Sequence, residues 1–261
     1  MIRRIDAISY ANGFRQLSPL WKSLFAAVMF ILSYLLHPFL QLTICLWIAV
    51  WCLLYARIPV RAYVMLLGMA LLFYVLSLPA LLLEIGHPAA GQAWITFPLP
   101  LTSLTVYITA GGVLRGGLLL ARLAACLSCL LFVIFTTPFT ELLLVLRRLR
   151  VPQLVLELML IMYRFLFLLS DSAHGMLLAR RLRGGSRGFR ATIREAGSMG
   201  GALLGQTMRR YRGLSQGLAA RGFTGEIPLP PYSGGPVPLR YRVEGCSGIA
   251  VLLLAQLWMS W

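Results

Sequence analysis

The sequence predicts an all-α integral membrane protein with about five transmembrane helices and an arginine-rich cytoplasmic helical region. The first supporting observation is composition: of 261 residues, 59% are hydrophobic and only 12% are charged, whereas soluble domains have about 25% charged residues. The second is that the mean hydropathy is +0.80. The third is the distribution of charge, because 24 Lys and Arg against 8 Asp and Glu give a net charge of +16.

Four apolar stretches precede the arginine-rich block and one follows it. A membrane-spanning helix needs about 20 mostly apolar residues. We expect the first four spans near residues 24–36, 39–55, 62–83 and 116–135. Pro38 and Pro138 follow the first and fourth of these stretches and should end them. Residues 84–100 contain several glycines and prolines and are expected to form a loop. The predicted membrane region is therefore 1–137, with four helices.

The remainder divides into three predicted regions. Residues 138–225 should form cytoplasmic amphipathic helices, 226–244 a proline-rich linker, and 245–261 a fifth transmembrane helix. Cytoplasmic segments of membrane proteins carry an excess of Lys and Arg. The basic N-terminus, the turn containing Arg57 and Arg61, and the arginine-rich block all fall on the same side when five spans are assumed. This scheme predicts a cytoplasmic N-terminus and an external C-terminus.

Two similar Arg-Gly elements stand out within residues 177–222, which contain ten arginines and a single acid, Glu195. They are Leu182-Arg183-Gly184 and Ala220-Arg221-Gly222. Glycine frequently ends a helix, and an arginine at such an end can bind a carboxylate with two hydrogen bonds. The 38 residues between the two arginines suit two helices joined at the glycine-rich region 197–205. Docking onto two acidic grooves of partner proteins is one interpretation, and anchoring at an anionic lipid surface is the other.

Several other functions lack support in the sequence. The single lysine, Lys22, lies in no P-loop motif, so the chain should not hydrolyse ATP alone. The three histidines are far apart, and the five cysteines lie mostly in apolar runs, so we expect no metal site, no cofactor and no disulfide framework. Nucleic-acid binding is disfavoured because the basic residues alternate with apolar spans. A membrane-embedded enzyme acting on lipid, with the arginines binding head groups, is the alternative function, although no convincing catalytic constellation occurs.

Further motifs resemble those of a known family. They are Thr136-Thr137-Pro138, Leu146-Arg147-Arg148-Leu149-Arg150-Val151-Pro152 and Tyr163-Arg164-Phe165, with Ile5-Asp6 and Pro19-Leu20-Trp21-Lys22 near the N-terminus. In order and spacing they resemble the transmembrane subunit of energy-coupling-factor (ECF) transporters, and most of all its CbiQ branch, which serves cobalt or nickel uptake. The resemblance extends from Asp6 to Gly225.

The resemblance implies a non-catalytic subunit in the bacterial inner membrane. It would couple two cytoplasmic CbiO-like ATPase subunits to a CbiM-like substrate-binding membrane subunit, with a small accessory membrane subunit as a further candidate partner. Arg183 and Arg221 would each sit in a groove of one ATPase, and the tripeptides Leu182-Arg183-Gly184 and Ala220-Arg221-Gly222 would be the coupling motifs. The partner subunit would bind the metal. Leu182 departs from the more usual alanine, and residues 209–214 are more basic than is usual for the family.

Overall fold

The computed structural model describes residues 2–15, 17–86, 93–98, 105–184, 188–222 and 237–260. The chain forms two compact units. The first comprises Met1–Leu142 and Ser233–Trp261, and the second comprises Leu143–Tyr232.

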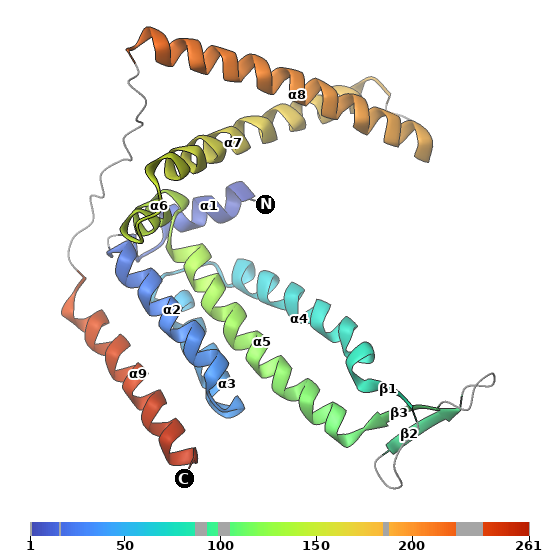
Figure 1. Cartoon of the computed structure of the whole chain (residues 1–261), viewed down its shortest axis with the longest axis vertical. Helices are drawn as coiled ribbons and strands as arrows, with labels where there is room; N and C mark the ends of the chain where they lie inside the picture. Colours follow the sequence, from blue (N-terminus) through green and yellow to red (C-terminus); the bar gives the residue numbers. More distant parts are fainter. Residues whose placement is uncertain are drawn as a thin grey trace. The chain divides into compact units, whose positions relative to one another are not determined.

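The first unit is a helical bundle with a small sheet (Figure 1). Its helices are α1 (Ile2–Ala11), α2 (Pro19–Leu35), α3 (Pro38–Val50), the π-helical turn η1 (Trp51–Tyr55), α4 (Val60–Leu82), α5 (Ala110–Thr136) and α9 (Leu239–Ser260). Both α2 and α3 begin with proline, whose fixed φ suits the first helical position and whose missing N–H is not needed there.

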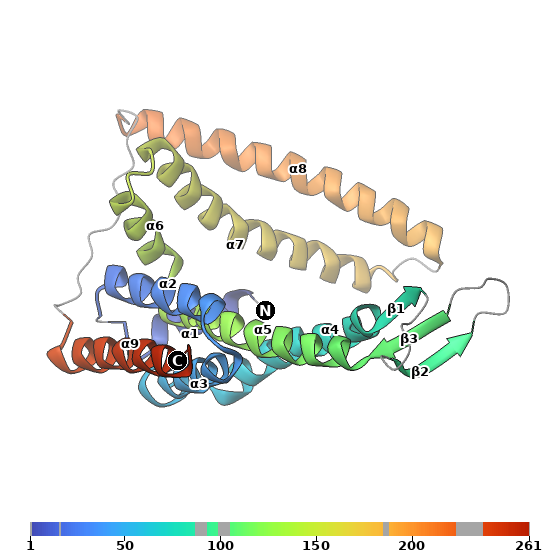
Figure 2. The same cartoon turned by 60° about the horizontal axis from the view of Figure 1, so that its bottom comes forward.

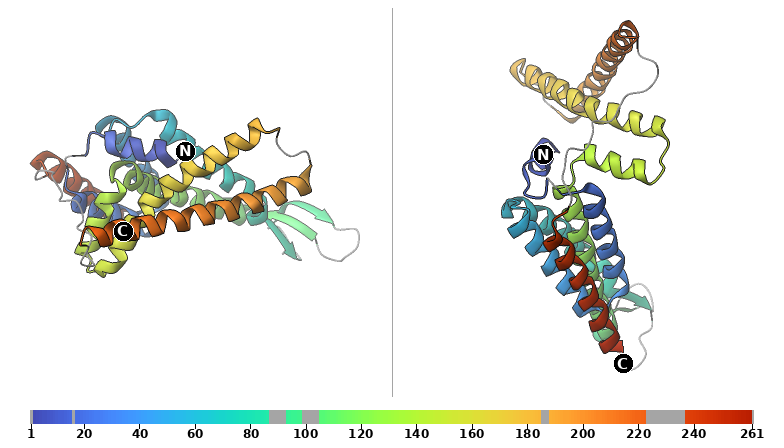
Figure 3. Two further views of the ribbon diagram at one scale, coloured as in Figure 1. Left: turned by 90° about the horizontal axis from the view of Figure 1, so that it is seen from above. Right: turned by 90° about the vertical axis from the view of Figure 1, so that its left-hand side faces the viewer.

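Helix α5 lies at the centre of this bundle and packs against α1, α2, α3 and α4 (Figure 3). Ala125, Cys129, Phe132 and Phe135 on α5 are buried in the hydrophobic core. Among them lies Ser128, which is also fully buried and whose hydroxyl lies 2.9 Å from the Tyr63 hydroxyl of α4. Hydrogen bonds between helices add to packing in membrane proteins because the hydrophobic effect does not hold helices together there. This contact therefore helps to fix α4 against α5.

Helix α9 joins the bundle through close backbone approach. A Cβ atom at Gly248 would lie 1.1 Å from the ring of Trp47, and one at Gly245 would lie 3.3 Å from Trp21. An added Cβ at Gly248 could be accommodated only if the Trp47 ring moved, and one at Gly245 would make a tight contact. The backbone N–H of His37 also donates a hydrogen bond to the Gln256 side chain at 3.0 Å. These contacts place α9 beside α2 and α3.

The predicted class is confirmed, because five helices among the described residues are long and apolar enough to cross a membrane. These five helices are not the same five that the sequence predicted. The five are 38–55, 60–80, 111–136, 153–182 and 239–259. The predicted first span is instead a shorter apolar helix of 17 residues, Pro19–Leu35. Residues 153–182, which we predicted to be cytoplasmic, meet the length and hydropathy requirement.

A three-stranded antiparallel sheet replaces part of the loop that we predicted. Strands β1 (Leu83–Gly86), β2 (Ala93–Pro98) and β3 (Thr105–Thr109) adopt the order β1-β3-β2. Ile85 pairs with Val106, which in turn pairs with Phe97. β-branched and aromatic residues favour strands, and β2 and β3 are rich in them. The loop prediction was wrong here because it gave the glycines and prolines more weight than this pattern.

The second unit is dominated by two long helices, α7 (Gln153–Leu182) and α8 (Phe189–Ala220), which lie alongside each other (Figure 2). Helix α6 (Phe139–Arg148) begins in the first unit and ends in the second. We expected a joint at the glycines of 197–205, and this was wrong because α8 is continuous there. The chain turns between α7 and α8 instead, where Gly184 and Gly188 have φ values of 91° and 108°. Such left-handed conformations suit glycine, whereas isolated glycines within a helix only weaken it.

The C-terminal helix begins earlier than predicted. We expected it from residue 245, but α9 starts at Leu239 and so includes Arg240 and Glu244, which form an ion pair at 2.7 Å. An i,i+4 ion pair supports a helix, which extends α9 into the predicted linker. Residues 226–236 of that predicted linker lie outside the described residues.

Candidate functional site: arginines at the ends of two long helices

Arg183 is the C-terminal cap of α7. Its backbone N–H donates a hydrogen bond to the carbonyl oxygen of Arg180 at 3.1 Å. The backbone N–H of Gly184 donates to the carbonyl oxygen of Arg181 at 3.3 Å. Gly184 then has a φ of 91° and ends the helix. A side chain at this glycine would meet no atom within 4 Å, so the requirement for glycine is conformational rather than steric.

Arg221 caps α8 in the same manner. Its backbone N–H donates a hydrogen bond to the carbonyl oxygen of Leu218 at 3.1 Å. The backbone N–H of Gly222 donates to the carbonyl oxygen of Ala219 at 3.1 Å. Gly222 has a φ of 69°. The backbone angles of the two arginines nearly coincide, with φ and ψ of −84° and 13° at Arg183 and of −92° and 10° at Arg221. The two predicted tripeptides are therefore equivalent local structures.

The residues of both tripeptides are exposed. Leu182 has a relative exposure of 80%. Within the described part of the chain, neither the Arg183 nor the Arg221 guanidinium has a hydrogen-bond or ion-pair partner. An exposed guanidinium keeps its full set of donors for an external carboxylate. Both arginines thus have the accessibility that docking requires.

The two helices form an antiparallel hairpin held by other arginines. Arg180 forms an ion pair with Glu195, the single acid of this block. Farther along, Nη1 of Arg210 donates a hydrogen bond to the carbonyl oxygen of Leu168 at 3.0 Å. Arg183 lies next to the start of α8 in sequence, and Arg221 lies at its end. The 32 residues of α8, at about 1.5 Å each, separate the two sites by about 48 Å.

A groove adjoins the first of the two sites. It encloses about 400 Å³ between α7 and α8, and Met176, Ala179, Arg180, Arg183, Glu195, Ser198, Met199 and Ala202 line it. The Arg180–Glu195 pair neutralises itself, so Arg183 gives the groove a net positive charge. Sequence reasoning identified Arg183 but missed the groove, because its walls come from two helices.

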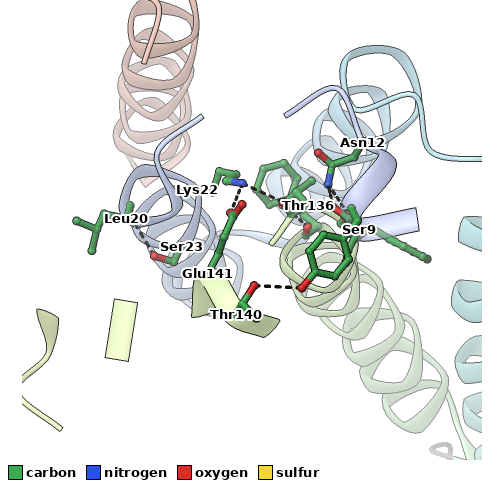
Figure 4. A network of polar contacts seen from close by, with 11 residues as sticks. Ser9, Asn12, Leu20, Lys22, Ser23, Thr136, Thr140 and Glu141 are labelled. Carbon is green, nitrogen blue, oxygen red and sulfur yellow. Dashed lines mark hydrogen bonds and ion pairs between the residues drawn. The ribbon is translucent and has the colours of Figure 1, made fainter. Parts of the chain in front are cut away.

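The first unit also contains a buried polar network that was not predicted from the sequence (Figure 4). Nζ of Lys22 donates hydrogen bonds to the Thr136 carbonyl oxygen at 3.0 Å and to Oε2 of Glu141 at 2.9 Å. Nδ2 of Asn12 donates to the Phe135 carbonyl oxygen at 2.8 Å. Thus Asn12, which follows α1, and Lys22 of α2 cap the last carbonyl groups of α5. One signal in the sequence could have pointed to this network, because Lys22 is the only lysine of the chain.

Metal-ligating residues are not clustered in the described ranges, where no group of three or more His, Cys, Asp or Glu could hold a metal ion. The cysteines Cys45, Cys52, Cys126, Cys129 and Cys246 are free thiols. Cys45 contacts the Ser128 hydroxyl at 3.2 Å, and Cys126 contacts the Ser33 hydroxyl at 3.1 Å. Through these contacts Cys45 of α3 and Cys126 of α5 lie between helices, whereas Cys246 is exposed.

Comparisons with known proteins agree with the motifs. The family described as CbiQ, cobalt transport protein, matches residues 12–232. The cobalt transport protein CbiQ of Rhodobacter capsulatus is 32% identical over 172 residues, which are 66% of this chain and 64% of that protein. CbiQ of Salmonella typhimurium is 27% identical over 239 residues, covering 86% of this chain and 99% of that protein.

A third relative is a fusion. The putative fused cobalt transport protein CbiMQ of Methanocorpusculum labreanum is 27% identical over 238 residues, which are 90% of this chain and 39% of that protein. The match to the family covers most of the chain and includes both Arg-Gly elements. This chain therefore belongs to the CbiQ cobalt transport protein family and is a multi-pass membrane protein.

Proposed function

We propose that this chain is the transmembrane coupling subunit of an ECF-type transporter for cobalt or nickel ions. It would transmit the motion of two ATPase subunits to a substrate-binding membrane subunit. The observation that carries the proposal is the pair of equivalent, exposed arginines at the ends of the α7–α8 hairpin. A separation of about 48 Å suits two separate partner subunits better than one groove.

Membership of the family and the fused relative support the membrane partner. In the CbiMQ protein, a CbiQ-like part and another part share one chain. The other part of such a fusion would correspond here to a separate CbiM-like subunit that binds the metal. The chain itself would then need neither a metal site nor a catalytic site, and its sequence has no P-loop motif.

In this proposal, α7 and α8 are the coupling helices and lie at the cytoplasmic surface. Arg180 and Arg210 hold them together, while Arg183 and Arg221 are left to bind carboxylates of the ATPases. An arginine docked into an acidic groove would carry force in both directions because the contact has opposite charges and a fixed geometry.

The test is reconstitution. The chain would be co-expressed with its candidate ATPase and substrate-binding subunits, purified in detergent and placed in vesicles. We expect a stable complex that takes up Co²⁺ only when ATP is hydrolysed. If the chain failed to retain an ATPase during purification, or if uptake proceeded without ATP, the proposal would be wrong.

A further inference from the structure

A buried ion pair between Lys22 and Glu141 lies where α5 ends and α6 begins, away from the two helix-end arginines. Lys22 has no exposed surface, and the side chain of Glu141 is only 14% exposed. A buried charge is tolerated only when it is paired and hydrogen-bonded, because burial removes its hydration. Both members of this pair meet that condition through each other, and Lys22 also through a backbone carbonyl.

The acceptors of Lys22 lie on both sides of a bend in the chain. Thr136 is the last residue of α5, and Glu141 lies in the first turn of α6. Pro138 stands between them and cannot continue the α5 hydrogen-bond ladder. One ammonium group therefore joins the end of one helix to the beginning of the next. We call this arrangement of Lys22, Thr136 and Glu141 the corner clasp.

The electrostatics of the helix ends favour the same arrangement. The C-terminus of a helix carries partial negative charge and the N-terminus partial positive charge. Lys22 lies at the C-terminal end of α5, and Glu141 lies near the N-terminal end of α6. Rotation of α6 away from α5 would break the contact between Lys22 and Glu141 and leave the buried ammonium group without its counter-ion, so the clasp resists such rotation.

The corner is connected to the coupling helices through the backbone of α6. Helix α6 begins within the first unit, where Glu141 lies, and continues into the second unit, which holds α7 and α8. We infer that Lys22 and Glu141 are positioning residues that keep the α5–α6 corner rigid, so that displacement of the coupling helices is passed to the membrane helices rather than absorbed at Pro138. This inference rests on the proposed function.

The test compares two variants with the unchanged chain. Lys22→Met with Glu141→Leu removes both charges and substitutes apolar groups of similar size, which buried pairs often tolerate without loss of stability. The matched control is Thr140→Val, which removes a neutral contact at the same corner, between the Thr140 hydroxyl and the Tyr10 hydroxyl at 3.1 Å. All three forms would be purified as the full complex.

Two measurements are needed. The first is hydrogen exchange at the backbone amides of residues 137 and 139–142, which we expect to be at least about tenfold faster in the double variant and unchanged in Thr140→Val. The second is the amount of Co²⁺ taken up per ATP hydrolysed in vesicles. We expect the double variant to hydrolyse ATP at a normal rate while its uptake per ATP falls at least about tenfold, the equivalent of about 1.4 kcal/mol.

The possible outcomes distinguish a failure of the corner clasp from a failure of the proposed transport function. Unchanged exchange in the double variant would overturn the inference, because it would show that the charges of Lys22 and Glu141 are not what holds the corner. Faster exchange with normal uptake per ATP would show that the clasp is only a packing feature. Lack of ATP-driven uptake by the unchanged complex would overturn the proposed function instead, and the exchange measurement, which needs no cobalt, would still decide whether the corner is held.

Discussion

Reversing the charge of either helix-end arginine is the most direct perturbation of the proposed coupling site. Arg183→Glu and Arg221→Glu should weaken ATPase docking and reduce cobalt uptake while the chain still folds and enters the membrane. Neither guanidinium has a hydrogen-bond or ion-pair partner in the described part of the chain. The helix ends are fixed by backbone hydrogen bonds and by Gly184 and Gly222, which the substitutions leave in place.

The structure predicts a small effect on stability and a large one on binding. An acidic side chain at a helix C-terminus opposes the helix dipole and costs about 0.3–1 kcal/mol at an exposed position. Removing one partner of a buried, hydrogen-bonded charge pair in an interface costs about 2–5 kcal/mol. At about 1.4 kcal/mol per decade, that is a loss of affinity of roughly 30-fold to several thousand-fold.

The assay is the dissociation constant of purified ATPase for the chain in detergent, followed by uptake in vesicles. The double reversal should be much worse than either single reversal, because one intact site can still tether one ATPase. Arg190→Glu is the control. Arg190 is exposed in the first turn of α8, where an acid agrees with the helix dipole, so its reversal should cost far less. Arg187 would be a second control but lies outside the described residues.

One result would refute the reasoning. If reversals at Arg183, Arg221 and Arg190 gave equal, small effects that vanished at high salt, the arginines would act as a diffuse anchor at an anionic membrane surface. Exposed charges are screened within about 8–10 Å at ordinary salt concentrations, whereas a docked pair excluded from water is not.

Three further predictions test topology, catalysis and packing. A reporter fused after α9 should be external if α2, α3, α4, α5 and α9 span the membrane and α7 stays at the cytoplasmic surface. A cytoplasmic signal would reject this count: either the 17-residue α2 does not span, or Gln153–Leu182, which is long and apolar enough, is a further span. The isolated chain should not hydrolyse ATP because it has no P-loop, and hydrolysis by pure chain free of contaminants would contradict this. Gly248→Ala should destabilise the bundle by about 1–3 kcal/mol through overpacking against Trp47, measured as a lower melting temperature, whereas Gly68→Ala, with no atom within 4 Å of the added Cβ, should not.

Local signals in the sequence determined much of this protein. The high apolar content and its distribution into long apolar runs predicted the membrane class, and the excess of arginine between them predicted a cytoplasmic block. The two helix-end arginines were predictable because the glycine after each adopts a left-handed conformation, a backbone property of that residue alone. Such features depend on neighbours in the chain and can be read without the fold.

Other features were decided by tertiary structure. The glycines of 197–205 looked like a joint, but α8 continues through them beside α7. The pairing of β1 with β3 joins residues that are 19 to 25 positions apart. Lys22 and Glu141 are separated by 119 positions, and no spacing rule connects them. Only the packing of α2 against α5, with α6 following Pro138, places that lysine beside a helix-end carbonyl and a carboxylate. The physical reason is that burial, unlike helix capping, depends on which distant segments meet, and the cost of an unpaired buried charge then selects the partner.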